Sequence, residues 1–190
     1  MKTTILTRSL ALTLLVFCTA CPPFDPTPPP DETVPQYILD MEMDTHAAVN
    51  DERVAESLPG LVMNETLREV ARAHSQDMID RNFFDHTNPD GDHVGDRLGD
   101  AGVTYVMAGE NIAWNQGYAD PVTAAVDGWM ASSGHRANIL RPQFTLTGIG
   151  IAVTPDDAYY FTQVFTDPSK GLGTTRTEIY TYGPIAIKKP

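Results

Sequence analysis

A proline-rich stretch divides this chain of 190 residues into a leader and a part that can fold. Seven prolines fall within residues 22–35, and this density favours an extended, polyproline-like spacer over a packed element. The apolar run before it, residues 9–17, follows a positively charged start and is too short to span a bilayer. Together these features are typical of a secretory signal peptide at residues 1–20. The folded part is therefore expected from residue 36 onward.

Both cysteines of the chain, Cys18 and Cys21, lie at the end of this leader. The tetrapeptide Cys18-Thr19-Ala20-Cys21 is similar to a bacterial lipobox, in which cleavage leaves Cys21 first and its thiol is acylated. An acylated Cys21 would hold the protein on a membrane surface, at the outer membrane or the cell surface. Cleavage after Ala20 without lipidation, followed by free secretion, is the alternative. The folded part has no cysteine, which excludes a disulfide framework or a thiolate metal site there.

The charge of the chain restricts its partners. The formal net charge is −12, and it becomes −14 when Lys2 and Arg8 are removed with the leader. Proteins that bind nucleic acid usually present a basic face, so we expect no nucleic-acid partner. Electrostatic attachment to anionic lipid is disfavoured for the same reason.

Hydrophobic periodicity predicts helices first and a β-hairpin later in the chain. Asn64 is expected to cap the second helix, and Asp120 with Pro121 to start the fourth. A turn is expected at Gly109-Glu110-Asn111, and Ser133 is expected to cap the last helix. The helices are expected at residues 36–58, 65–81, 92–101, 121–130 and 133–140, and the hairpin strands at 145–153 and 159–166. This order indicates the α+β class.

Three ionisable residues, His86, Glu110 and His135, each lie beside a short apolar run. Two imidazoles and a carboxylate that come together can bind a divalent metal or transfer protons. His74 lies on the apolar face of the second expected helix, which favours a core histidine over a metal ligand. Ser132 and Ser133 lack the Gly-x-Ser-x-Gly pattern of a nucleophile elbow, and serine at a helix start is usually a cap.

The chain resembles the CAP superfamily (cysteine-rich secretory proteins, antigen 5 and pathogenesis-related 1), in its bacterial secreted and lipoprotein branch. The resemblance covers residues 35–167 and rests on an ordered set of motifs. They are residues 50–53, Ala73-His74-Ser75 with Met78, Phe84-Asp85-His86, Asp96-Arg97, Gly109-Glu110-Asn111-Ile112, Trp129, residues 132–140 and Gln163-Val164-Phe165. It implies a three-layer α-β-α sandwich with a central antiparallel sheet and a cavity on one face. The domain then spans residues 36–167, after a lipidated Cys21 and linker at 21–35. Residues 168–190 form a tail, with a further strand within residues 177–187 left open.

The resemblance places His86, Glu110 and His135 around that cavity, and we add Asn111 and Gln163 as candidate cavity residues. Animal members carry a glutamate three residues after the tryptophan, whereas this chain has Ser132 there. His86 and His135 are candidate ligands for zinc or another divalent cation, with Glu110 as an orienting group or a catalytic general base. In the structural alternative, Glu110 accepts hydrogen bonds from His135 or Arg136 and locks the loops.

Three functions follow from these alternatives. The first is an extracytoplasmic binding module of the cell envelope for an envelope or lipid ligand, held on the membrane surface through Cys21. The second is a metal-dependent, peptidase-like hydrolase that uses His86, His135 and Glu110. The third is a surface scaffold in which the same residues form a structural network.

Overall fold

The computed structural model describes residues 34–168 and 178–188. The predicted signal peptide, Cys21 and the predicted linker up to residue 33 lie outside this part, as do residues 169–177. Within it, no helix is long and apolar enough to cross a membrane.

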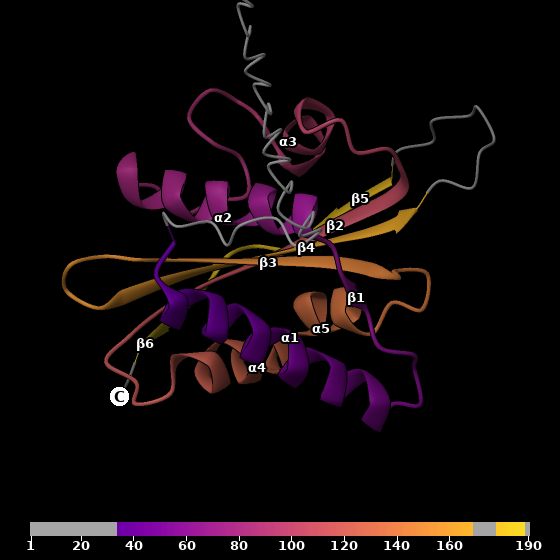
Figure 1. Ribbon diagram of the computed structural model, residues 1–190, viewed down its shortest axis with the longest axis horizontal. Coiled ribbons are helices and arrows are strands. Elements are labelled where there is room, and N and C mark those ends of the chain that lie inside the picture. The colour runs from indigo at the N-terminus through magenta and orange to yellow at the C-terminus, as the bar shows by residue number, and fades with distance from the viewer. Residues whose placement is uncertain (1–33, 169–177, 189–190) are drawn as a thin grey trace, which may run out of the picture. The chain divides into compact units, whose positions relative to one another are not determined.

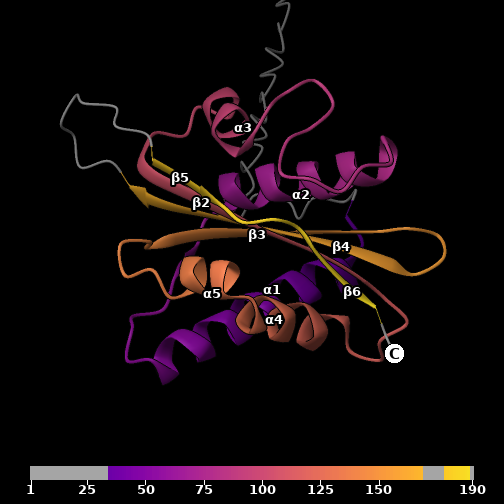
Figure 2. The same cartoon turned by 180° about the vertical axis from the view of Figure 1, so that it is seen from behind.

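The described residues form three layers, with a six-stranded sheet between two layers of helices (Figure 1). Helices α2 (Glu65–Asp80) and α3 (Val94–Asp100) cover one face of the sheet. The other face carries α1 (Gln36–Ala55), α4 (Pro121–Ala131) and α5 (Ser133–Ile139), as the reverse view in Figure 2 also shows. The predicted fold class, an α+β sandwich of three layers, is confirmed.

The centre of the sheet is antiparallel and its edges are parallel. Strand β4 (Ala158–Pro168) pairs antiparallel with both β3 (Leu146–Val153) and β2 (Tyr105–Gln116). The short β1 (Val62–Met63) adds to β3 in parallel, and β5 (Glu178–Thr181) and β6 (Ile185–Lys188) add in parallel to β2. The hairpin predicted at residues 145–166 is present as β3 and β4.

Local sequence signals explain the helix starts. Asn64 Oδ1 accepts a hydrogen bond from the Leu67 amide, 3.1 Å away, and caps α2 as predicted. Asp120 caps α4 in the same way, with Pro121 as the first helical residue. The prediction for Ser133 is wrong: Ser132 precedes α5, and its side chain makes no capping hydrogen bond.

The turn predicted at residues 109–111 is also wrong, because Gly109, Glu110 and Asn111 lie inside the twelve-residue strand β2. The glycine followed by two polar residues predicts a turn from the sequence alone. In the structure β2 is paired on both edges at Gly109 and Glu110. The side chains of Glu110 and Asn111 are both fully buried. They are tolerated inside the strand because buried partners satisfy their hydrogen bonds.

Two glycines of β3 set the distance between the sheet and α2. A Cβ at Gly148 would lie 2.1 Å from the Leu67 carbonyl carbon, and one at Gly150 would lie 2.0 Å from the Arg72 nitrogen. Only a residue without a side chain permits this approach of backbone to backbone. The result is a fixed position for α2, which carries His74 to the site described next.

Candidate functional site

Four side chains from separate elements form one buried group, which we call the Glu110 cluster: His74, His86, Arg97 and Glu110. Arg97 of α3 donates from Nη2 to Glu110 Oε2 at 2.6 Å. His86, from the loop after α2, places Nδ1 2.9 Å from Glu110 Oε1. His74 of α2 has its Nε2 4.0 Å from the same oxygen. The cluster therefore ties α2, α3 and the loop between them to β2.

Glu110 is a permanently ionised acceptor in this arrangement. Burial alone would raise the pKa of its carboxyl, but the Arg97 charge and the His86 hydrogen bond outweigh burial and lower that pKa to about 2. The sequence suggested His135 or Arg136 as partners of Glu110, and the structure instead provides Arg97 and His86. Arg136 pairs with the exposed carboxylate of Glu56 at 2.6 Å.

His86 has an acceptor at each ring nitrogen. Nδ1 faces the Glu110 carboxylate, and Nε2 faces the backbone carbonyl of Tyr182. Neither partner can donate, so both bonds form only when His86 is a doubly protonated imidazolium. Burial lowers the pKa of His86, but the hydrogen bond and charge of Glu110 raise it above its ordinary value overall.

The other two histidines of the region are neutral. Burial lowers the pKa of His135 to about 4, and the nearby His86 acts in the same direction. Its Nδ1 lies 2.8 Å from the Ser132 hydroxyl, whereas its buried Nε2 has no partner among the described residues. Burial also lowers the pKa of His74, whose Nε2 donates to the Asp85 carbonyl at 3.0 Å.

Asn111 and Gln163 lie across the β2–β4 ladder from each other. Asn111 Nδ2 donates to the His135 carbonyl at 3.1 Å, so it holds α5 against β2. Gln163 Nε2 contacts the Thr147 hydroxyl at 3.3 Å. Side chains of adjacent strand residues point to opposite faces, which places Asn111 and Glu110 on different sides of the sheet.

The predicted zinc pair does not fit a metal in this conformation. A zinc ligand needs a nitrogen lone pair, and an imidazolium at His86 offers none. Of the four ring nitrogens of His86 and His135, only the Nε2 of His135 has no partner among the described residues. Within residues 34–168 and 178–188, no three histidine, cysteine or acidic residues are placed to hold a metal ion.

Sequence reasoning missed the part that residues 178–188 play at this site. The Tyr182 carbonyl accepts from His86, and the Tyr180 carbonyl accepts from Asn138 at 3.2 Å. The strand pattern within residues 177–187 was visible, but no local signal connects it with a histidine 96 positions earlier. The site is thus covered by a segment from the end of the described chain.

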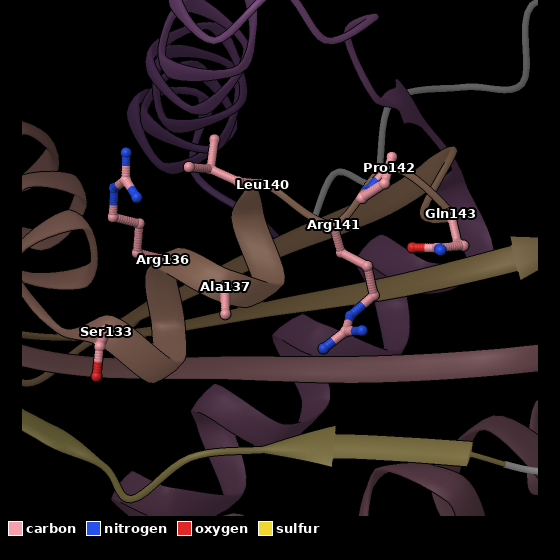
Figure 3. A pocket seen from close by; sticks show the side chains of 7 residues that line it. All are labelled: Ser133, Arg136, Ala137, Leu140, Arg141, Pro142 and Gln143. Atoms are coloured by element: carbon pink, nitrogen blue, oxygen red, sulfur yellow. The ribbon is translucent and has the colours of Figure 1, made fainter.

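Two surface pockets lie elsewhere in the described part. One, of about 420 Å³, is shown in Figure 3 beside α5, where the side chains of Arg136 and Arg141 extend in opposite directions. The other, of about 590 Å³, is a groove between α1 and the start of α4, and its lining includes Met41, Ala48 and Tyr159. Neither is lined by His86, Glu110 or His135.

Comparisons with known proteins identify the family of the chain. The model of the cysteine-rich secretory protein family (CAP) matches residues 46–165. The protein YkwD of Bacillus subtilis is 42% identical over 118 residues, which are 62% of this chain and 45% of YkwD. A crystal structure of an extracellular protein containing an SCP domain, from Bacillus anthracis, is 35% identical with a TM-score of 0.59. The matched region covers 70% of this chain and 43% of the Bacillus anthracis chain.

An outer surface protein from Borrelia burgdorferi shares the fold at 17% identity, with a TM-score of 0.62 over 68% of this chain and 94% of its own. This chain spans less than half the length of YkwD and of the Bacillus anthracis protein. The matched residues 46–165 nevertheless contain every member of the Glu110 cluster. The chain belongs to the cysteine-rich secretory protein (CAP) family.

Proposed function

We propose that this protein is an extracytoplasmic binding module of the cell envelope, held on a membrane surface through an acylated Cys21. We prefer binding to hydrolysis because of the protonation state and hydrogen bonds of Glu110. A general base works best with a pKa near the operating pH, whereas the pKa of Glu110 is lowered to about 2 and both its oxygens are bound. The carboxylate therefore serves to hold loops in place.

The groove between α1 and α4 is the proposed ligand site. Its volume of about 590 Å³ lies within the range of small-molecule pockets. Met41, Ala48, Val122 and Tyr159 supply apolar surface, and the charged groups among its described lining residues are all carboxylates. An uncharged lipid or apolar envelope component fits this lining better than an anionic one. The Bacillus anthracis and Borrelia relatives, described as extracellular and outer surface proteins, support an extracytoplasmic setting.

The test is to express the full chain with its leader in a bacterial host, purify it from the membrane fraction, and analyse its organic extract by mass spectrometry. We expect a lipid that co-purifies with the parent and falls by about tenfold in Ala48→Phe, which fills the groove. Ala47→Phe is the matched control, because Ala47 lies beside Ala48 in α1 and does not line the groove. A parent that carries no lipid contradicts the proposed ligand.

The anchor has a separate test. Cys21→Ser removes the thiol that the lipobox-like segment offers for acylation. We expect this variant in the soluble extracytoplasmic fraction and the parent in the membrane fraction. Equal partition of the two would contradict anchoring through Cys21, and a parent found in the soluble fraction would indicate free secretion.

The metal-dependent hydrolase is the second candidate, and it is favoured by the Nε2 of His135, which has no partner among the residues that the structure describes. Zinc titration by calorimetry would compare the parent with His86→Ala/His135→Ala at neutral pH. We expect no saturable binding in the parent, because His86 donates from both nitrogens. One-site binding that disappears in the double variant would establish a metal site and favour hydrolysis.

A further inference from the structure

Residues 178–188, the C-terminal segment, cover the outer edge of β2 (Figures 1 and 2). β5 pairs with residues 107–110 and β6 with residues 113–116, both in parallel. The family match ends at residue 165, so the C-terminal segment lies outside it. Without this segment, the backbone donors and acceptors on that edge of β2 would be open to another strand.

Four glycines make room for the C-terminal segment, and we call the surface that they form with the β2 edge the β2 groove. A Cβ added at any of them would meet the C-terminal segment. The contacts are Gly95 with Ile179 Cδ1 at 2.6 Å, Gly109 with the Tyr180 carbonyl at 3.3 Å, Gly128 with Ile187 Cδ1 at 2.4 Å, and Gly134 with Tyr182 Cγ at 2.3 Å. Three of them lie inside helices, where glycine is less favourable than alanine. A packing role accounts for that unfavourable choice.

Two aromatic residues of the C-terminal segment, Tyr180 and Tyr182, pack beside the β2 groove on the face of the sheet towards α5. The Arg141 guanidinium lies 3.6 Å from the centroid of the Tyr180 ring, a cation–π contact. Two residues later, the Tyr182 ring packs on Gly134, and its carbonyl accepts from His86. Tyr180 lies in β5 and Tyr182 directly follows its last residue, so the two rings come from one short stretch of the C-terminal segment.

We propose that the β2 groove binds an extended peptide with two aromatic side chains two residues apart, and that residues 178–188 occupy it in cis. Addition of a peptide strand to a sheet edge is an established recognition mode, with backbone pairing for affinity and side-chain pockets for specificity. The proposed partner in trans is an extended segment of another extracytoplasmic polypeptide, which would take the place of residues 178–188. No lining residue of the α1–α4 groove belongs to the β2 groove, so lipid binding and peptide binding succeed or fail separately.

The experiment uses a fluorescent peptide with the sequence of residues 177–188 and the full chain. In the parent, the tethered segment competes at an effective concentration in the millimolar range, so we expect weak binding of the free peptide. Tyr180→Ala/Tyr182→Ala weakens the tethered segment, and we expect it to bind the peptide at least about tenfold more tightly than the parent. A peptide in which both tyrosines are alanine should lose that gain.

Two controls keep the result interpretable. Tyr37→Ala removes an exposed tyrosine of α1, and it should bind the peptide as weakly as the parent. Gly134→Ala added to the double variant should abolish peptide binding, because its Cβ takes the place of the Tyr182 ring. If the double variant does not unfold cooperatively, Tyr182→Ala alone carries the same comparison. A folded variant that binds the peptide no better than the parent, or binds the alanine peptide equally well, overturns the proposal.

Discussion

Glu42 and Glu110 are fully buried glutamates of this domain, and each is held by cationic side chains. Glu42 of α1 receives Arg68 Nε at 2.6 Å, Arg72 Nη2 at 2.7 Å and the backbone amide of Ile151 at 3.1 Å. We call these residues the Glu42 cluster. It ties α1 to α2 and satisfies a donor on β3, as the Glu110 cluster ties α2 and α3 to β2.

The two clusters differ in the chemistry of their cations. Guanidinium groups remain charged at every pH at which the protein is folded, so the Glu42 cluster is a fixed connection. The Glu110 cluster adds imidazoles, which change charge near neutral pH, and one of them contacts the C-terminal segment. A buried carboxylate is therefore a structural tie in both places, but only the Glu110 cluster also contains imidazoles.

The largest expected effect is the loss of either carboxylate. Glu42→Ala and Glu110→Ala each remove a fully buried carboxylate and the charge-assisted hydrogen bonds that it accepts, so we expect each to lower the free energy of unfolding by about 3–5 kcal/mol. Urea denaturation measures both. Glu56→Ala is the control: its ion pair with Arg136 is about half exposed, and we expect a change within about 0.5 kcal/mol. A Glu110→Ala variant as stable as the parent would remove Glu110 from the comparison.

The next effect tests the acid sensitivity of the candidate site through His135 of α5, which belongs to neither cluster. The pKa of His135 is about 4 in the folded protein, against about 6.5 when unfolded. Because the folded value is lower, the neutral ring stabilises the fold fully above pH 6.5, and this contribution is lost as pH falls towards 4. We expect His135→Asn to lose about 2 kcal/mol less than the parent over that interval, after allowance for solvent screening.

Denaturation curves at several pH values measure that difference, and carboxylates common to both proteins cancel from it. Asn115→Ala is the control: it removes a buried polar side chain that does not titrate, so it should keep the pH dependence of the parent. An equal reduction of the slope in Asn115→Ala and His135→Asn would show that acid sensitivity is not specific to His135.

The smallest effect concerns the arginines. Arg97 Nη1 also donates to the carbonyls of His86 and Asp92, both at 3.1 Å. Lysine cannot reproduce this fork, so we expect Arg97→Lys to cost about 1–3 kcal/mol. Arg68→Lys should cost less than about 1 kcal/mol, since Arg72 still contacts both Glu42 oxygens. Equal costs in thermal or urea unfolding would mean that the two clusters use arginine in the same way.

Local signals and motif resemblance predicted much of this structure from the sequence. The caps at Asn64 and Asp120 and the β3–β4 hairpin depend on neighbouring residues, and they are confirmed. The resemblance placed His86 and Glu110 together, and they share a hydrogen bond. The roles predicted for the site residues in metal binding and catalysis stay predictions.

The remaining features depend on partners distant in sequence. Glu42 interrupts the apolar face of its helix, which suggests an exposed side chain. The arginines that allow it to be buried lie 26 and 30 residues later, where no local pattern reveals them. The interior of β2 resembles a turn until its partner strands are known. Arg53 is fully buried and contacts no carboxylate of the described residues, and it donates to the carbonyls of Ile139 and Phe144. Such tertiary contacts override local propensity, and one sequence does not reveal them.

The pairing of β2 has a consequence for the order in which the domain can form. Its described neighbours in the sheet, β4, β5 and β6, all follow it in the chain. A polypeptide that emerges N-terminus first therefore holds Glu110 in an unpaired strand until residues beyond 158 are available. Contacts of such long sequence separation slow folding. The carboxylate of Glu110 is thus among the last groups to be buried. The sheet cannot be completed until nearly all residues of the domain have been synthesised.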